Sequence, residues 1–163
     1  MQSLQDIDWK NWQAKDPASL TFIFKNNRVL LIRKKRGLGA GKINAPGGRL
    51  EPRETMLDCA VREVQEELCI TPVDPEFVGE NLFQFTNGYS IHVYTYVAYD
   101  YEGVPAETDE AIPLWFDIDK IPYEEMWEDD KIWLPMLLKG EKFKGRYIFD
   151  NDRMLDHDVH LLQ

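Results

Sequence analysis

Apolar residues gather in short runs along most of the chain, and polar or glycine-containing segments separate these runs. Residues 20–24 and 29–33 are two of them, and the turn-like sequence Lys25-Asn26-Asn27 between them predicts a β-hairpin. Later strand-like runs follow, and the run at residues 91–99 is rich in β-branched and aromatic residues, which favour strands. The later runs are residues 76–85, 91–99, 114–116, 147–149 and 154–159. The last two predict a C-terminal hairpin.

The pattern changes to a helical period at residue 55. Apolar residues lie at i, i+3, i+4, i+7 and i+11 and form one stripe: Leu57, Ala60, Val61, Val64 and Leu68. Thr55, with Asp58 three residues later, predicts a capping box at the start of this helix, and Pro72 predicts its end. Residues 129–138 predict a second helix, in which Pro135 causes a kink or marks a broken start.

The segment between the first hairpin and the first helix is rich in glycine. Gly37, Gly39 and Gly41 are followed by Pro46-Gly47-Gly48, a composition that predicts a loop whose backbone can approach a ligand closely. Residues 1–18 are polar apart from Trp9 and Trp12 and form either a short helix or an arm. We therefore expect one mixed α/β domain over residues 19–163, preceded by an N-terminal arm over residues 1–18.

Composition and charge narrow the class of protein. The chain has 163 residues, 44% of them hydrophobic, which is enough for one domain with its own core. A net charge of −10 argues against a sequence-independent binder of nucleic-acid polymers. No apolar run reaches the roughly 20 residues that cross a bilayer, and the N-terminus lacks the features of a secretory signal. We expect a cytoplasmic protein without a membrane partner.

The two cysteines are consistent with a reducing compartment. If Cys59 and Cys69 lie on one helix, ten residues of rise separate them by about 15 Å, which is too far for a disulfide.

Three glutamates of the first helix are the strongest candidates for chemistry. Glu63, Glu66 and Glu67 lie at spacings of three and four residues, so their side chains share one helix face. Taken alone, such a face is most often simply solvated. Carboxylates can meet a phosphorylated ligand only through bridging cations, however, so a site for such a ligand here implies a metal.

The surrounding residues resemble the Nudix box, G-x5-E-x7-R-E-U-x-E-E-x-G-U, where U is a bulky apolar residue. The chain reads GRLEPRETMLDCAVREVQEELCI from residue 48 onward. Its matching polar and glycine positions are Gly48, Glu54, Arg62, Glu63, Glu66 and Glu67. One position departs, because Cys69 replaces the final glycine. That glycine is expected to stop the helix in a left-handed conformation, which costs other residues roughly 1–2 kcal/mol.

The resemblance implies a metal-dependent hydrolase. Glu63, Glu66 and Glu67 would hold one to three Mg²⁺ ions, with Mn²⁺ as a possible substitute, and the Gly48 backbone would contact the metal or shape the loop. Arg62 would steady the carboxylates, and Glu54 would pair with it. We expect loss of Glu67 to be the most damaging single change.

Further stretches resemble the branch of the family that hydrolyses oxidised purine nucleoside triphosphates such as 8-oxo-dGTP to monophosphate and pyrophosphate. They are residues 34–42 with Asn44, Thr108-Asp109-Glu110, Trp115-Phe116, Ile121-Pro122 and residues 126–130. The implied fold is an α/β/α sandwich around a mixed sheet. The resemblance also implies roles for single residues: Asn44, Asp129 and Asp130 on the base edge, Trp127 and Phe83 against the ring, Lys34 near the phosphates, and Glu110 as a further metal ligand or base.

Two adjacent carboxyl groups in a partly dry pocket cannot both ionise easily, so one of Asp129 and Asp130 can stay protonated. The pair would then offer a donor and an acceptor to a purine edge. Glu128 departs from related enzymes, which carry proline there, and its charge could alter which aspartate keeps the proton. Without the resemblance, Trp127 would be read as a core aromatic and the aspartates as acids at a helix N-terminus.

Other functions stay open at this point. A Nudix hydrolase of dinucleoside polyphosphates or nucleotide sugars would share the metal helix and differ in the pocket. A nucleotide sensor without catalysis is disfavoured because no carboxylate of the box is missing. Isomerase chemistry on an isoprenoid diphosphate finds no support in residues 127–130. We expect a monomer or a weak dimer.

Overall fold

Strands of one large sheet account for most of the regular structure in the computed structural model, which describes residues 2–162. They are β1 (Asp16–Lys25), β2 (Arg28–Lys34), β3 (Ile43–Asn44), β4 (Gly47–Arg49), β6 (Glu76–Phe85), β7 (Ser90–Ala98), β9 (Ala111–Asp117), β10 (Phe143–Asp150) and β11 (Arg153–Leu161). The order is β11-β10-β6-β7-β1-β2-β3, with β4 paired to β1 and β9 paired to β2. The pairs β1–β7 and β6–β10 are parallel and the others antiparallel, so the sheet is mixed.

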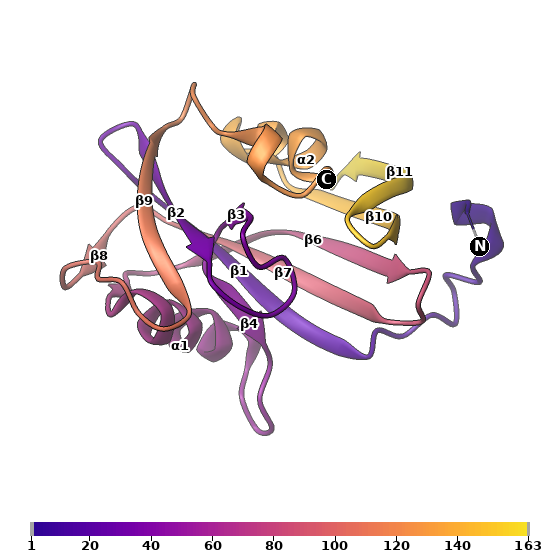
Figure 1. Cartoon of the computed structure of the whole chain (residues 1–163), viewed down its shortest axis with the longest axis horizontal. Helices are drawn as coiled ribbons and strands as arrows, with labels where there is room; N and C mark the ends of the chain where they lie inside the picture. The colour runs from indigo at the N-terminus through magenta and orange to yellow at the C-terminus, as the bar shows by residue number, and fades with distance from the viewer. Residues whose placement is uncertain (1, 163) are drawn as a thin grey trace.

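Two helices cover opposite faces of this sheet (Figure 1). They are α1 (Met56–Leu68) and α2 (Asp130–Leu138). Successive side chains of a strand point to opposite faces. On β2, Leu30 and Ile32 belong to the core cluster that contains residues of α1, whereas Val29 and Leu31 belong to the cluster that contains residues of α2. The α/β/α sandwich implied by the resemblance is therefore confirmed.

Most predicted strands are present, and several are longer than predicted. The first hairpin is formed by β1 and β2, and the C-terminal hairpin by β10 and β11. The glycine-rich segment was predicted as loop, but it contains the short strands β3 and β4. Two further short strands, β5 (Thr71–Pro72) and β8 (Tyr101–Glu102), pair separately from the main sheet, and 3-10 turns occupy Leu4–Asp6 and Tyr123–Glu125. Within residues 2–162, none of the helices combines the length and apolarity needed to cross a membrane.

Local sequence signals predicted the start of α1 correctly but not its end. The Thr55–Asp58 capping box is present, as predicted. The predicted end at Pro72 is wrong, because the helix ends at Leu68 and Pro72 belongs to β5. Leu57 of the predicted apolar stripe is not buried, since this side chain is 45% exposed in the first helical turn. Cys69 caps the helix in the left-handed region with φ 63° and ψ 25°, where the box carries glycine.

We predict that Cys69→Gly stabilises the protein by about 0.5–1 kcal/mol. Glycine removes the strain of a Cβ in the left-handed region, and its greater freedom in the unfolded chain offsets part of the gain. The side chain of Cys69 is exposed, so little packing is lost. The check is the midpoint of urea unfolding under reducing conditions. Cys69→Ala, which keeps the Cβ, is the matched control, and an equal shift in both variants would contradict the prediction.

The N-terminal segment lies against the far end of the sheet. The backbone N–H of Leu4 donates to Asp156 at 2.8 Å, and Nε1 of Trp12 donates to Oε1 of Gln84 at 2.8 Å. β1 begins at Asp16, inside the range predicted as the arm. A separate arm that ends at residue 18 stays a prediction.

Candidate active site

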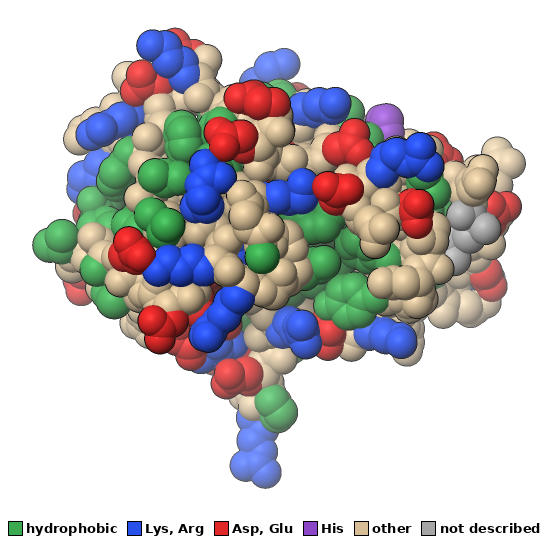
Figure 2. Space-filling model, viewed as in Figure 1, with side chains coloured by type: hydrophobic (Ala, Val, Ile, Leu, Met, Phe, Trp, Pro, Cys, Tyr) green, Lys and Arg blue, Asp and Glu red, His purple; other side chains and the backbone are tan. Residues whose placement is uncertain are grey.

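A single cavity collects side chains from distant parts of the sequence. It opens between the sheet and the segment that leads into α2, and Figure 2 shows hydrophobic side chains in a hollow on this face. All six residues predicted to bind the substrate line it: Lys34, Asn44, Phe83, Trp127, Asp129 and Asp130. Gly48 and Glu67 of the predicted metal site line it as well. The cavity thus joins the acidic helix to the candidate base pocket.

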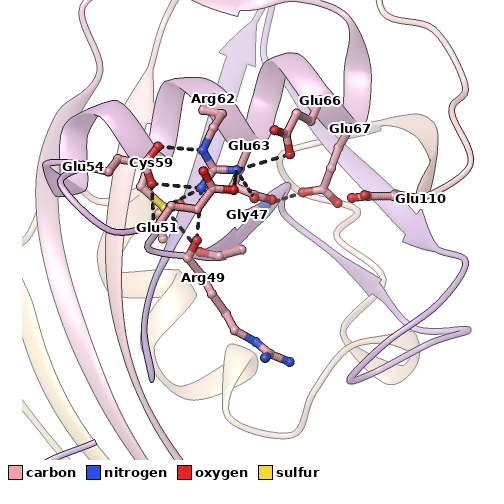
Figure 3. A network of polar contacts seen from close by, with 12 residues as sticks. Gly47, Arg49, Glu51, Glu54, Cys59, Arg62, Glu63, Glu66, Glu67 and Glu110 are labelled. Carbon is pink, nitrogen blue, oxygen red and sulfur yellow. Dashed lines mark hydrogen bonds and ion pairs between the residues drawn. The ribbon is translucent and has the colours of Figure 1, made fainter. Parts of the chain in front are cut away.

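Three carboxylates form a compact group beside this cavity. Glu63, Glu67 and Glu110 each offer an oxygen atom, and these atoms lie within 4.8 Å of one another. Glu63 and Glu67 come from α1, and Glu110 comes from the loop before β9, opposite them in Figure 3. Glu66 does not belong to this compact group, and its side chain is 49% exposed. Its assignment as a metal ligand therefore stays a prediction.

Glu67 is the most deeply buried of these acids, with 2% of its surface exposed. The backbone N–H of Gly47 donates to its Oε1 at 2.8 Å. The pKa of Glu67 is raised to about 8, chiefly by burial and also by the neighbouring Glu63 and Glu110, whereas the Gly47 N–H and Lys34 oppose the shift. Hard oxygen donors that repel one another in a dry site are the ligand set that a divalent cation satisfies. The residues present therefore fit a divalent metal.

The guanidinium group of Arg62 forms hydrogen bonds with several glutamates on and beside the acidic face of α1. Its Nε donates to Glu54 at 2.6 Å, and its Nη1 donates to Glu63 at 2.6 Å and to Glu66 at 3.2 Å. Figure 3 shows the guanidinium group between these side chains. The pairing of Glu54 with Arg62 is thus confirmed, and Arg62 contacts both Glu63 and Glu66, as predicted.

We predict that Glu54→Gln lowers the free energy of unfolding at pH 7 by about 1.5–3 kcal/mol, the range for a hydrogen bond to a charged group. The hydrogen bonds from Arg62 lower the pKa of Glu54 from 4.5 to about 2. A depressed carboxyl pKa stabilises the folded state above pH 4.5, and this stabilisation is lost as the pH falls towards 2. The difference between wild type and variant in urea unfolding should shrink over that window. A difference that is independent of pH would contradict the prediction.

The glycines at the start of the box allow the loop to pack against α1 and β1. A Cβ on Gly48 would lie 2.2 Å from Oε2 of Glu63, and one on Gly47 would lie 1.9 Å from the carbonyl oxygen of Ser19. No side chain fits at either position without displacing its neighbours. Gly48 therefore shapes the loop, and a direct contact between its carbonyl and a metal stays a prediction.

At the other end of the cavity, Asp129 and Asp130 are both buried, with 2% and 3% exposed. Nε1 of Trp133 donates to Asp129 Oδ2 at 2.7 Å, whereas Asp130 Oδ2 has no hydrogen-bond partner among residues 2–162. Burial raises the pKa of Asp129 to about 6. Burial, and then the charge of Asp129, raises the pKa of Asp130 well above its ordinary value. Both shifts favour one shared proton on the aspartate pair, which lies at the start of α2.

Aromatic side chains form the walls between the two ends. Phe83 stacks on Tyr147 with ring centres 4.8 Å apart and planes 17° apart. Trp127 meets Phe149 edge-on at 5.5 Å. Lys34 also lines the cavity, and burial lowers its pKa while Glu67 opposes that shift. The site thus combines aromatic walls, a buried aspartate pair, one lysine and the cluster of three carboxylates formed by Glu63, Glu67 and Glu110.

Comparison with known proteins identifies the family. Residues 14–137 match the family model described as the NUDIX domain. The chain belongs to the Nudix family. As a Nudix protein, it is similar to the oxidized purine nucleoside triphosphate hydrolase of Danio rerio, with 41% identity over 145 residues, which covers 86% of this chain and 92% of the relative. The protein of the same description from Mus musculus is 37% identical, again covering 86% and 92%.

A solved structure has the same fold. The MutT protein from Bacillus halodurans superposes with a TM-score of 0.80 and 24% identity, covering 88% of this chain and 97% of that one. The Nudix family implies a divalent metal, and Glu63, Glu67 and Glu110 form an acidic cluster whose oxygen atoms lie close enough together to bind one. Sequence reasoning missed Trp133, the donor to Asp129. Its position four residues after Asp129 in the predicted helix is the signal that could have found it.

Proposed function

We propose that this Nudix enzyme hydrolyses oxidised purine nucleoside triphosphates to the monophosphate and pyrophosphate, with Mg²⁺ as its metal. One observation carries the proposal: Glu67 of the carboxylate cluster and the buried aspartate pair line one cavity, together with the aromatic side chains of Phe83 and Trp127. The two relatives described as oxidized purine nucleoside triphosphate hydrolases, which match most of the chain, support the same substrate class.

The base end of the cavity suits a purine that has gained an oxygen. Asp129 accepts a hydrogen bond in its ionised form, and Asp130 donates one while it keeps its proton. Asn44 adds an amide with both functions, and its Oδ1 already accepts from the N–H of Ala45 at 2.8 Å. Phe83 and Trp127 bound the slot for the ring. The polar groups would therefore recognise the edge of the base, and the aromatic groups its faces.

The phosphate end of the cavity suits hydrolysis. Bound Mg²⁺ would neutralise phosphate charge and lower the pKa of a coordinated water. Glu63 and Glu67 would hold it, and Lys34 would orient a phosphate oxygen. In the reaction, the water oxygen forms a bond to phosphorus while the bond to the bridging oxygen breaks, and pyrophosphate leaves. Glu110, whose side chain is 38% exposed, would accept the proton of the water or act as a further ligand.

The test is turnover with Mg²⁺ on 8-oxo-dGTP, 2-oxo-dATP, Ap4A and ADP-ribose, with the products identified. The proposal expects turnover of the first two nucleotides and release of pyrophosphate. Turnover of only Ap4A or ADP-ribose would keep the metal site and move the function to dinucleoside polyphosphates or nucleotide sugars. Binding without turnover on any of the four would favour a sensor. A parallel series with Mn²⁺ tests whether it substitutes for Mg²⁺.

A monomer or weak dimer and a cytoplasmic location remain part of the proposal. Sedimentation of the full chain tests the first, and localisation of the tagged protein tests the second.

A further inference from the structure

A lysine outside the cavity lies over the ring of Trp127. The Nζ atom of Lys42 is 5.3 Å from the centre of the indole. Trp127 lines the cavity, and Lys42 is not among the lining residues. The same Nζ atom pairs with Asp152 Oδ2 at 3.3 Å, and the lysine side chain is only 26% exposed. An ion pair therefore keeps the cation close to this ring.

Two further contacts position Asp152 and the loop that carries Lys42 relative to Trp127. The backbone N–H of Met154 donates to Oε1 of Glu128 at 2.8 Å. Because Glu128 directly follows Trp127, this bond ties the turn that carries Asp152 to the segment that carries the indole. On the other side, a Cβ on Gly39 would lie 2.8 Å from Nε1 of Trp127, so the loop that carries Lys42 packs against the edge of the indole. The cation, its counter-ion and the ring are therefore held together by contacts outside the cavity.

We propose that Lys42, held by Asp152 over the ring of Trp127, is a specificity-determining residue for an electron-rich purine base. The inference rests on the proposed function. A cation on one face of an aromatic ring is attracted to its π electrons and draws them away from the opposite face. That opposite face then stacks more favourably on a base whose added oxygen has enriched its own π system. Lys42 thus acts on the substrate through Trp127.

The position of Lys42 separates this role from phosphate binding. Lys34 is the lysine that lines the cavity and faces Glu67 and Glu63, where the phosphates are expected. Lys42 is not among the lining residues, lies over the ring of Trp127 and has its own carboxylate partner in Asp152. A phosphate role predicts weaker binding only of phosphorylated ligands after its removal, whereas the stacking role predicts weaker binding of the bare nucleoside as well.

The test measures binding of 8-oxo-deoxyguanosine and of its 5′-monophosphate by titration calorimetry without added metal, to wild type, Lys42→Gln and Lys42→Arg. We expect Lys42→Gln to weaken both ligands by about five-fold, within the range of a partly desolvated cation–π contact. Lys42→Arg should stay within about two-fold of wild type, because arginine keeps the cation. In turnover, KM for 8-oxo-dGTP should rise by the same factor in Lys42→Gln while kcat changes by less than about two-fold.

The matched control is Asp152→Asn, which keeps the ammonium group and removes only its counter-ion, and which should weaken binding less than Lys42→Gln does. Equal binding by wild type and Lys42→Gln would overturn the inference and leave the proposed function intact. Weaker binding of the monophosphate with unchanged binding of the nucleoside would also overturn it, in favour of a phosphate role. If wild type itself binds neither ligand, the proposed function fails, and the inference fails with it.

Discussion

Glu67→Gln should reduce turnover of 8-oxo-dGTP by about a hundred-fold or more, because a bound divalent cation contributes several kcal/mol of transition-state stabilisation. The carboxylate is 2% exposed and belongs to the only group in residues 2–162 in which three acidic side chains approach closely enough to share a metal ion. Glutamine keeps the shape and can still accept from the N–H of Gly47, but it lacks the charge that a divalent cation requires. The effect should therefore lie in kcat and in metal affinity.

The fold of this variant should be preserved. Burial raises the pKa of Glu67 to about 8, so a neutral side chain is tolerated at this position. Far-UV circular dichroism and urea unfolding check this point, and the metal dependence of turnover gives the loss of affinity. Glu102→Gln makes the same chemical change at an exposed position of β8 and serves as the matched control. Turnover of Glu67→Gln close to that of the control would remove Glu67 from the metal site.

Asp129→Asn should lower the preference for 8-oxo-dGTP over dGTP by about ten- to a hundred-fold, because a buried hydrogen bond to a charged group contributes about 1.5–3 kcal/mol. The amide can still accept from Nε1 of Trp133, so the local packing is retained. It cannot supply the negative charge against which Asp130 keeps its proton. The preference for 8-oxo-dGTP over dGTP should therefore fall, while metal binding by the distant carboxylate cluster is unaffected.

The check is kcat/KM for both nucleotides at one metal concentration, together with metal affinity. Asp119→Asn, at an exposed position of the chain, is the matched control. Affinity for Mg²⁺ should be the same in all three proteins. An unchanged ratio of kcat/KM for 8-oxo-dGTP to kcat/KM for dGTP would show that the aspartate pair does not recognise the base. The proposed metal site would not be affected by that result.

Local patterns in the sequence were sufficient to predict α1 and the hydrophobic strands. The capping residues of α1 act within four residues of one another, and β-branched runs favour strands wherever they pair. The exposure of Leu57 was not predicted because periodicity gives one face of a helix but not the point at which the sheet stops covering it. The end of α1 was misplaced because Cys69 adopts a left-handed conformation that cysteine rarely takes.

Apart from the acidic face of α1, the candidate site was predictable only through the family resemblance. Glu63 and Glu67 lie four residues apart on a helix, so their proximity follows from spacing. Glu110, Asn44 and Asp130 come from segments far apart in the chain, and no local pattern brings them together. Contacts such as Lys42 with Asp152 and Glu128 with Met154 depend on how the C-terminal hairpin packs beside the glycine-rich loop, and pairwise contacts of this kind leave no trace in a single sequence.

The most direct test of the central claim is a competition between 8-oxo-dGTP and dGTP in one reaction with Mg²⁺ and the full chain, with both monophosphates and pyrophosphate quantified over time. The account predicts that the oxidised nucleotide is consumed at least about ten-fold faster at equal concentration, because one buried charged hydrogen bond is enough for that ratio. It also predicts one pyrophosphate for each monophosphate formed. Equal consumption of the two nucleotides, or release of single phosphates in place of pyrophosphate, would contradict it.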